Sequence, residues 1–89
     1  MKVKALLTNE GKWIKGRYAE DTLHNQSTIS LGVRFCLAGA IYRCYPKVSQ
    51  SARIFQKVSD KIGPDLSDWN DAPGRTFAEV RALILELDI

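Results

Sequence analysis

The sequence predicts a mainly α protein, a compact small bundle of three to four helices that forms a single domain over residues 1–89. Three observations lead to this fold class. The chain has 89 residues, 45% of them apolar, which suffices for one core but not for two. Several segments carry apolar residues at helical spacing. Charged residues make up 26% of the chain, so it does not have the composition of a disordered protein.

The N-terminal third contains one short helix and one ambiguous stretch. Residues 2–8 place their apolar side chains on one side, but a helix this short needs packing from the rest of the chain. Residues 11–26 intersperse a few large apolar groups among charges, and their two glycines weaken a helix. We expect either a short extended arm or a frayed helix near residues 11–26.

The central helix is expected over Ile29–Tyr42, because its residues are apolar nearly all round and such a helix is buried in the middle of a domain. Three hydroxyl side chains are candidates for its N-cap: Ser27, Thr28 and Ser30. Gly32 and Gly39 each cost about 1 kcal/mol relative to Ala inside a helix. A neighbouring backbone that approaches closely at residues 38–40 would offset this cost. Pro46 ends the element.

The third helix is expected over Ser51–Ile62, with Ser49 or Ser51 as its N-cap. Its apolar residues form one stripe. Gly63 supplies a left-handed residue at the C-terminal end, and Pro64 prevents continuation.

A polar loop over Asp65–Arg75 precedes the last helix. That helix begins at Thr76 with a capping box, in which the Thr hydroxyl and the Glu79 carboxylate bind each other's backbone amides. It extends to about Leu87. Trp13 and Trp69 are expected to close the two ends of the core. The full set of expected structural residues is Trp13, Phe35, Cys36, Leu37, Gly39, Phe55, Trp69, Thr76, Phe77 and Val80.

The two cysteines are expected to be free core residues. Cys36 and Cys44 would lie about 12 Å apart within one helix, whereas a disulfide tolerates at most about 7 Å. No cluster has metal-ligand spacing, so we expect no metal and no cofactor. No apolar run is long enough for a signal peptide or a membrane span, which predicts a cytoplasmic protein without a membrane partner.

The net charge of +3 conceals a split along the chain. Residues 1–64 carry 11 basic and four acidic side chains, a net charge of +7, and residues 65–89 carry two basic and six acidic ones, a net charge of −4. Three groups of candidate binding residues follow from the charges. They are Lys12, Lys15 and Arg17 interleaved with Trp13 and Tyr18, the helical column Arg53, Lys57 and Lys61, and the pair Asn70 and Asp71 beside Trp69.

Three motifs run through most of the chain, roughly residues 11 to 85. They are Trp13-x-x-Gly16-x-x-Ala19-x-Asp21, then Arg34-Phe35-Cys36-Leu37-Ala38-Gly39-Ala40, then Trp69-Asn70-Asp71-x-Pro73-x-Arg75-Thr76-x-x-Glu79-Val80. Together they resemble an uncharacterised family of small proteins from bacteria and their phages. The resemblance implies a small helical domain with no assigned activity. Phe77 stands where that pattern has a histidine, so chemistry by that histidine would be absent here.

No catalytic constellation is recognisable around the single histidine, His24, and no glycine-rich phosphate loop is present. We therefore expect a non-enzymatic interaction protein that is associated with a phage or prophage and binds, and inhibits, a host or defence protein. The alternative is a nucleic-acid-binding protein that uses the basic residues above. The third hypothesis is a nucleotide-ligand binder or a small enzyme. The sequence leaves the oligomeric state open.

Overall fold

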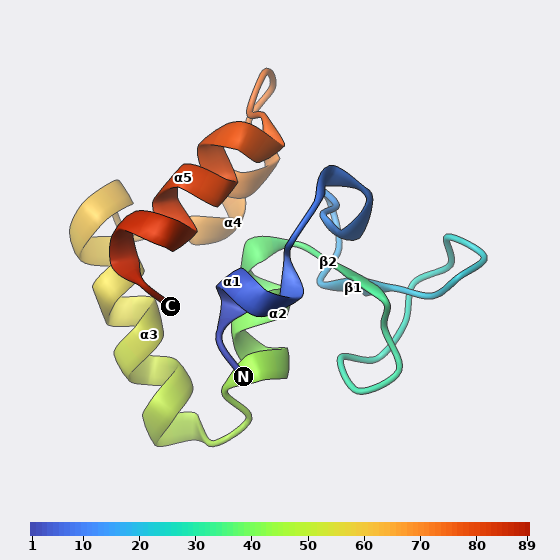
Figure 1. Ribbon diagram of the computed structural model, residues 1–89, viewed down its shortest axis with the longest axis horizontal. Coiled ribbons are helices and arrows are strands. Elements are labelled where there is room, and N and C mark those ends of the chain that lie inside the picture. The colour runs from blue at the N-terminus through green and yellow to red at the C-terminus, as the bar shows by residue number, and fades with distance from the viewer.

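Five helices, one short 3-10 helix and a two-stranded sheet make up the computed structural model of residues 1–89 (Figure 1). Along the chain these elements are α1 (Val3–Leu6), η1 (Glu10–Lys12), β1 (Ala19–Glu20), β2 (Arg34–Phe35), α2 (Leu37–Cys44), α3 (Val48–Ile62), α4 (Leu66–Asp71) and α5 (Phe77–Leu87). The mainly α fold class predicted from the sequence is confirmed. No helix has the length and apolar character that crossing a membrane requires.

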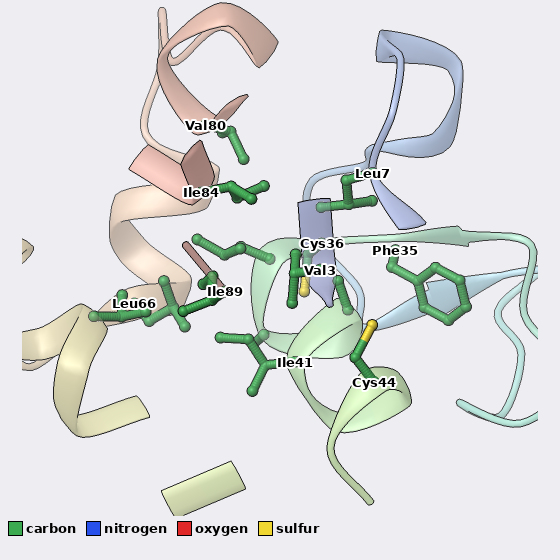
Figure 2. Packing of buried hydrophobic residues seen from close by; sticks show 14 of the residues in the cluster. Val3, Leu7, Phe35, Cys36, Ile41, Cys44, Leu66, Val80, Ile84 and Ile89 are labelled. Carbon is green, nitrogen blue, oxygen red and sulfur yellow. The ribbon is translucent and has the colours of Figure 1, made fainter. Parts of the chain in front are cut away.

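The core lies around α2, which packs against α1, α3, α4 and β2. Leu37 and Ile41 of α2 are fully buried, as are Val80 and Ile84 of α5. Figure 2 shows side chains from α2, α5 and the N-terminal segment converging on this core. The two chain ends meet beside it, where the Lys4 amide donates to the Ile89 carbonyl at 3.0 Å.

The predicted helix over Ile29–Tyr42 is wrong in its first half, because α2 begins only at Leu37. Residues 29–31 form a turn, and Arg34–Phe35 pair with the arm as β2. The candidate N-caps Ser27, Thr28 and Ser30 therefore cap no helix. Cys36 is the N-cap instead, and its Sγ accepts a hydrogen bond from the Gly39 amide at 3.3 Å. Leu31 and Val33 are apolar but 75% and 45% exposed, so they extend the apolar pattern of α2 toward the N-terminus although the core does not cover them.

Of the two predictions for residues 11–26, the short extended arm is correct and the frayed helix is wrong, apart from the single turn of η1. β1 pairs antiparallel with β2, with Ala19 opposite Phe35. Gly39 of α2 lies directly beneath the arm, since a Cβ atom at this position would sit 1.9 Å from the Tyr18 carbonyl oxygen. The predicted close approach of a backbone at residues 38–40 is therefore confirmed.

The helix α3 begins at Val48, before the predicted start, and no side chain caps it. Ser49 and Ser51 as N-caps are therefore wrong. Ser51 is buried within the first turn, and its hydroxyl donates to the Val48 carbonyl at 3.2 Å. Gly63 ends the helix with a φ of +94°, as the sequence predicts.

The segment Asp65–Arg75 contains α4, a short helix where the sequence predicts a polar loop. Asp65 caps this helix by accepting from the Asp68 amide at 2.9 Å. The predicted capping box of α5 is confirmed. The Thr76 hydroxyl accepts from the Glu79 amide at 3.3 Å, and the Glu79 carboxylate accepts from the Thr76 amide at 3.0 Å.

Candidate functional site

The three sequence motifs meet at the side chain of Asn70, which is fully buried. Its Oδ1 accepts from the Trp13 indole Nε1 at 2.7 Å and from the Leu37 amide at 3.0 Å. Its Nδ2 donates to the Ile14 carbonyl at 3.1 Å and to Asp71 Oδ1 at 2.9 Å. Asn70 thus joins the arm, the start of α2 and the end of α4.

This geometry corrects the expectation that Asn70 is a binding residue, because a buried amide with all its hydrogen bonds formed is inaccessible to a partner. Asp71 is exposed, but its Oδ1 also accepts from the Gly16 amide at 3.0 Å. Lys15 Nζ donates to the Ala72 carbonyl at 2.9 Å. Asn70, Asp71 and Lys15 therefore hold the arm against α4.

The two tryptophans are half-buried at the edge of the core. The Trp13 ring lies 6.2 Å from Phe77, and Lys15 Nζ lies 5.6 Å from its centroid. The Arg75 guanidinium lies 4.0 Å from the centroid of the Trp69 ring. With its N–H bound to Asn70 and its ring in these contacts, Trp13 is not the free stacking platform that the first basic group requires.

The remaining expected structural residues occupy three kinds of position. Phe35, Cys36, Leu37, Gly39 and Val80 are buried. Phe55 and Phe77 are half-buried against the core, and Thr76 is an exposed cap.

The two basic groups lie on different elements, one on the arm and η1 and the other on α3 (Figure 1). In the column on α3, Lys57 Nζ donates to the Leu87 carbonyl at 2.8 Å and Lys61 Nζ pairs with Glu86 at 3.1 Å. Two of the three column residues thus serve contacts with α5, and Arg53 alone makes neither a side-chain hydrogen bond nor an ion pair.

A third surface brings together aromatic side chains from the arm, α2 and α3. The Tyr18 and Tyr42 rings lie 6.1 Å apart in an edge-to-face arrangement, and the Tyr42 and Phe55 rings lie 5.0 Å apart. Tyr18 is 53% exposed and Tyr42 is 44% exposed, although each contacts a neighbouring ring. We call Tyr18, Tyr42 and Phe55, with the flanking Arg17 and Arg43, the aromatic face.

Each tyrosine of the aromatic face lines a hollow in the surface. The larger hollow, about 510 Å³, is lined by Thr28, Ile29, Ser30, Tyr42, Arg43 and Pro46. The smaller one, about 220 Å³, is lined by Gly16, Arg17, Tyr18, Cys36, Ser67 and Asp71. Small-molecule pockets usually measure about 300–1,000 Å³, so the smaller hollow has the size for a single side chain.

The aromatic face is basic. Arg17 and Arg43 are exposed, and no acidic side chain pairs with either. Residues 22–59, which supply most of this surface, contain five basic side chains and no acidic one. The face therefore presents two arginines without ion-pair partners beside exposed aromatic rings.

Cys36 lines the smaller hollow, but its thiol is poorly suited to nucleophilic chemistry. Burial raises its pKa, so the thiol stays protonated at neutral pH. Its sulfur also caps α2. Cys36 and Cys44 are both free and buried, as expected from the sequence.

Sequence reasoning missed most of the aromatic face. Arg17 and Tyr18 belong to the first group of candidate binding residues on the arm. Tyr42 and Arg43 lie at the end of an apolar helix, and nothing in the sequence marks them as binding residues. Only the fold brings Tyr18, Tyr42 and Phe55 together. The one signal in the sequence is the absence of acidic residues from 22–59.

Comparison with known proteins places the chain in a family. Residues 1–87 match a family of unknown function, DUF6197. No curated protein and no solved structure is detectably similar to the chain. The match covers nearly the whole chain, so the resemblance to an uncharacterised family is confirmed at that level. The protein belongs to DUF6197, a family of unknown function.

Proposed function

We propose that this protein is a non-enzymatic interaction protein that binds an acidic surface of a partner protein through the aromatic face. The observation that carries the proposal is the exposure of Tyr18 and Tyr42, at 53% and 44%, between two arginines without acidic partners. Rings that touch each other but remain half exposed can bury further area against a second molecule.

The residue types support an interface. Tyrosine and arginine are enriched among the residues that contribute most to binding energy in protein complexes. A tyrosine has few rotatable bonds, so its immobilisation costs little entropy. Uncompensated arginines speed encounter with an acidic partner and disfavour basic ones. The two hollows beside Tyr18 and Tyr42 would receive side chains of the partner.

The motif resemblance supports a biological setting for this proposal. Because similar motifs occur in small bacterial and phage proteins, we place the protein in the bacterial cytoplasm as a phage- or prophage-associated factor. Its partner is then a host or defence protein that it occupies and inhibits.

The test compares two double variants with equal charge change. Arg17→Glu/Arg43→Glu reverses the two arginines of the aromatic face. Lys12→Glu/Arg53→Glu reverses two exposed residues outside it, which belong to the basic groups of the nucleic-acid hypothesis. Each tagged variant and the wild type are used to purify partners from bacterial lysate with and without nuclease treatment, and the affinity of the recovered partner is measured with purified proteins.

We expect Arg17→Glu/Arg43→Glu to weaken binding by at least about tenfold, which corresponds to about 1.4 kcal/mol. The control variant should stay within about threefold of the wild type. Equal loss in both variants, or none in either, would refute the role of the aromatic face. Binding that disappears after nuclease treatment and in Lys12→Glu/Arg53→Glu would favour the nucleic-acid alternative instead.

A further inference from the structure

The larger hollow of the aromatic face lies between two parts of the chain that are distant in the sequence. One wall is the turn that carries residues 28–30. The other wall consists of Tyr42 and Arg43, in the last turn of α2, and Pro46 just beyond it. None of the lining side chains is acidic, and Arg43 is the only charged one. The hollow therefore combines an apolar and aromatic surface with one positive charge.

Both walls are held in place by the fold itself. In the turn, the Thr28 carbonyl accepts from the Gly32 amide at 3.0 Å. A Cβ atom at Gly32 would lie 2.8 Å from the Cβ of Ala19, so the turn packs directly against β1. On the other wall, Tyr42 contacts the two other rings of the aromatic face. Because neither wall has to be ordered by a ligand, binding in this hollow loses little conformational entropy.

The polar groups that are left free at the hollow are hydrogen-bond donors. The Arg43 side chain is exposed and makes neither a hydrogen bond nor an ion pair. Thr28 Oγ1 and Ser30 Oγ lie 3.5 Å apart, so one hydroxyl donates to the other, which keeps its own proton for a ligand. The Thr28 carbonyl already accepts from the Gly32 amide and from the Ser27 hydroxyl. This set of free donors suits an anionic group.

The two arginines of the aromatic face differ in what they can offer to an anion. Arg17 Nη1 donates to the His24 carbonyl at 3.3 Å, which ties its guanidinium to the loop of the arm. The smaller hollow beside Arg17 is also lined by Asp71, whose carboxylate repels an anion. Arg43 has all five of its N–H donors free, and no carboxylate lines its hollow. An anionic group is therefore attracted to the larger hollow rather than to the smaller one.

We propose that the larger hollow binds an acidic segment of the partner protein, with an Asp or Glu carboxylate on Arg43 and an apolar neighbour against Ile29 and Pro46. This inference rests on the proposed function and names the chemistry that the partner presents. A carboxylate fits better than a phosphate, because the lining carries a single positive charge whereas phosphate-binding sites combine several arginines. The volume of about 510 Å³ leaves room for the second, apolar side chain.

Binding of short peptides to the full-length chain, followed by NMR, tests this proposal. The probes are acetyl-Gly-Glu-Leu-Gly-amide, the same peptide with Gln in place of Glu, the same peptide with Gly in place of Leu, and inorganic phosphate. The Glu-Leu peptide should shift the backbone amide signals of residues 28–30 and 42–45, with a dissociation constant of about 1 mM because the contact is small. The Gln peptide should bind at least about tenfold more weakly, since it loses a charged hydrogen bond. The Gly peptide should bind at least about threefold more weakly.

Variants of exposed residues locate the carboxylate site. Arg43→Gln should weaken the Glu-Leu peptide by at least about tenfold, whereas the matched control Arg17→Gln should stay within about threefold of the wild type. Thr28→Val/Ser30→Ala removes the two hydroxyls and should weaken the peptide by about three- to tenfold. All these side chains are exposed, and circular dichroism melting checks that each variant is folded.

Four results would overturn the proposal. They are no binding of the Glu-Leu peptide, equal binding of the Glu and Gln peptides, equal binding to Arg43→Gln and to the wild type, and shifts confined to other parts of the chain. Phosphate that shifts the same amide signals at lower concentration than the peptide would also overturn it, in favour of a phosphorylated partner.

The peptide experiment and the partner experiment fail separately. If Arg17→Glu/Arg43→Glu loses the partner but no peptide binds, the aromatic face is the interface and only the assignment of the larger hollow is wrong. If the peptides bind as expected but that double variant keeps the partner, the proposed function is wrong and the preference of the hollow for acidic segments stands.

Discussion

Replacing Asn70 by Ala should destabilise the protein more than any other single change of a polar residue. The change leaves the Leu37 amide without its partner in the core, and it frees the half-buried Ile14 carbonyl and Trp13 indole N–H. Each buried group left unpaired costs about 1–3 kcal/mol. The Trp13 N–H and the Ile14 carbonyl belong to half-buried residues and can reach water, so we count the Leu37 amide alone and expect a loss of about 1–3 kcal/mol. Domains of this class have a total stability of about 5–15 kcal/mol.

Asn70→Asp separates the hydrogen bonds from the packing, because it keeps the size of the side chain. The carboxylate can still accept from Trp13 and Leu37, but it presents an oxygen where Nδ2 donates to Ile14 and Asp71. Two carboxylates side by side favour protonation, which raises the pKa of the new carboxyl group in the folded state. The penalty should therefore be full at neutral pH and shrink as the pH falls toward about 4, the ordinary pKa of Asp.

Urea unfolding followed by tryptophan fluorescence measures these effects, since Trp13 itself reports on the Asn70 contact. Asn25→Ala is the matched control, because Asn25 is exposed. A surface substitution usually changes the free energy of unfolding by no more than about 0.5 kcal/mol. If Asn70→Ala has an effect this small, the assignment of Asn70 as the residue that joins the three motifs is refuted. If the difference in stability between Asn70→Asp and the wild type does not shrink at low pH, the role of the hydrogen bonds that Asn70 donates is refuted.

Three further changes test separate features by the same unfolding assay. Gly39→Ala should destabilise the protein by about 1–3 kcal/mol or more, because the added Cβ would lie 1.9 Å from the Tyr18 carbonyl oxygen, although Ala normally stabilises a helix. Gly11→Ala is the control, since its Cβ would meet only the end of a side chain. A Gly39→Ala variant as stable as the wild type would contradict the close approach. Thr76→Ala should cost about 1 kcal/mol through loss of the α5 cap, and an equally stable variant would show that the cap is dispensable. Hydrogen bonds from Lys4 and Lys2 lower the pKa of Asp88 to about 2, so its contribution to stability is present at neutral pH and is lost as the pH falls from about 4 to 2. Asp88→Asn should flatten the dependence of stability on pH in that window, and an unchanged profile would exclude the contribution.

The sequence by itself determined the features that depend on neighbouring residues. Length, composition and apolar periodicity led to the mainly α fold class. Thr76 and Glu79 lie three residues apart, so the capping box follows from local spacing alone. Gly63 ends α3 with a positive φ for the same local reason. Gly39 also predicted the close approach of another segment, since a glycine inside an apolar helix indicates a close neighbour even when that neighbour is unknown.

Only the tertiary structure decided the features that depend on distant residues. The segment 29–35 is turn and strand because its backbone hydrogen bonds go to the arm, as in the bond from the Val33 amide to the Glu20 carbonyl at 2.8 Å. Asn70 looks like any polar loop residue until the arm and α2 enclose it. The aromatic face likewise arises from which side of each helix the core covers. The periodicity of apolar residues shows which of them share one side of a helix. Whether that side is buried depends on contacts between segments far apart in the chain, and a local pattern carries no information about those contacts.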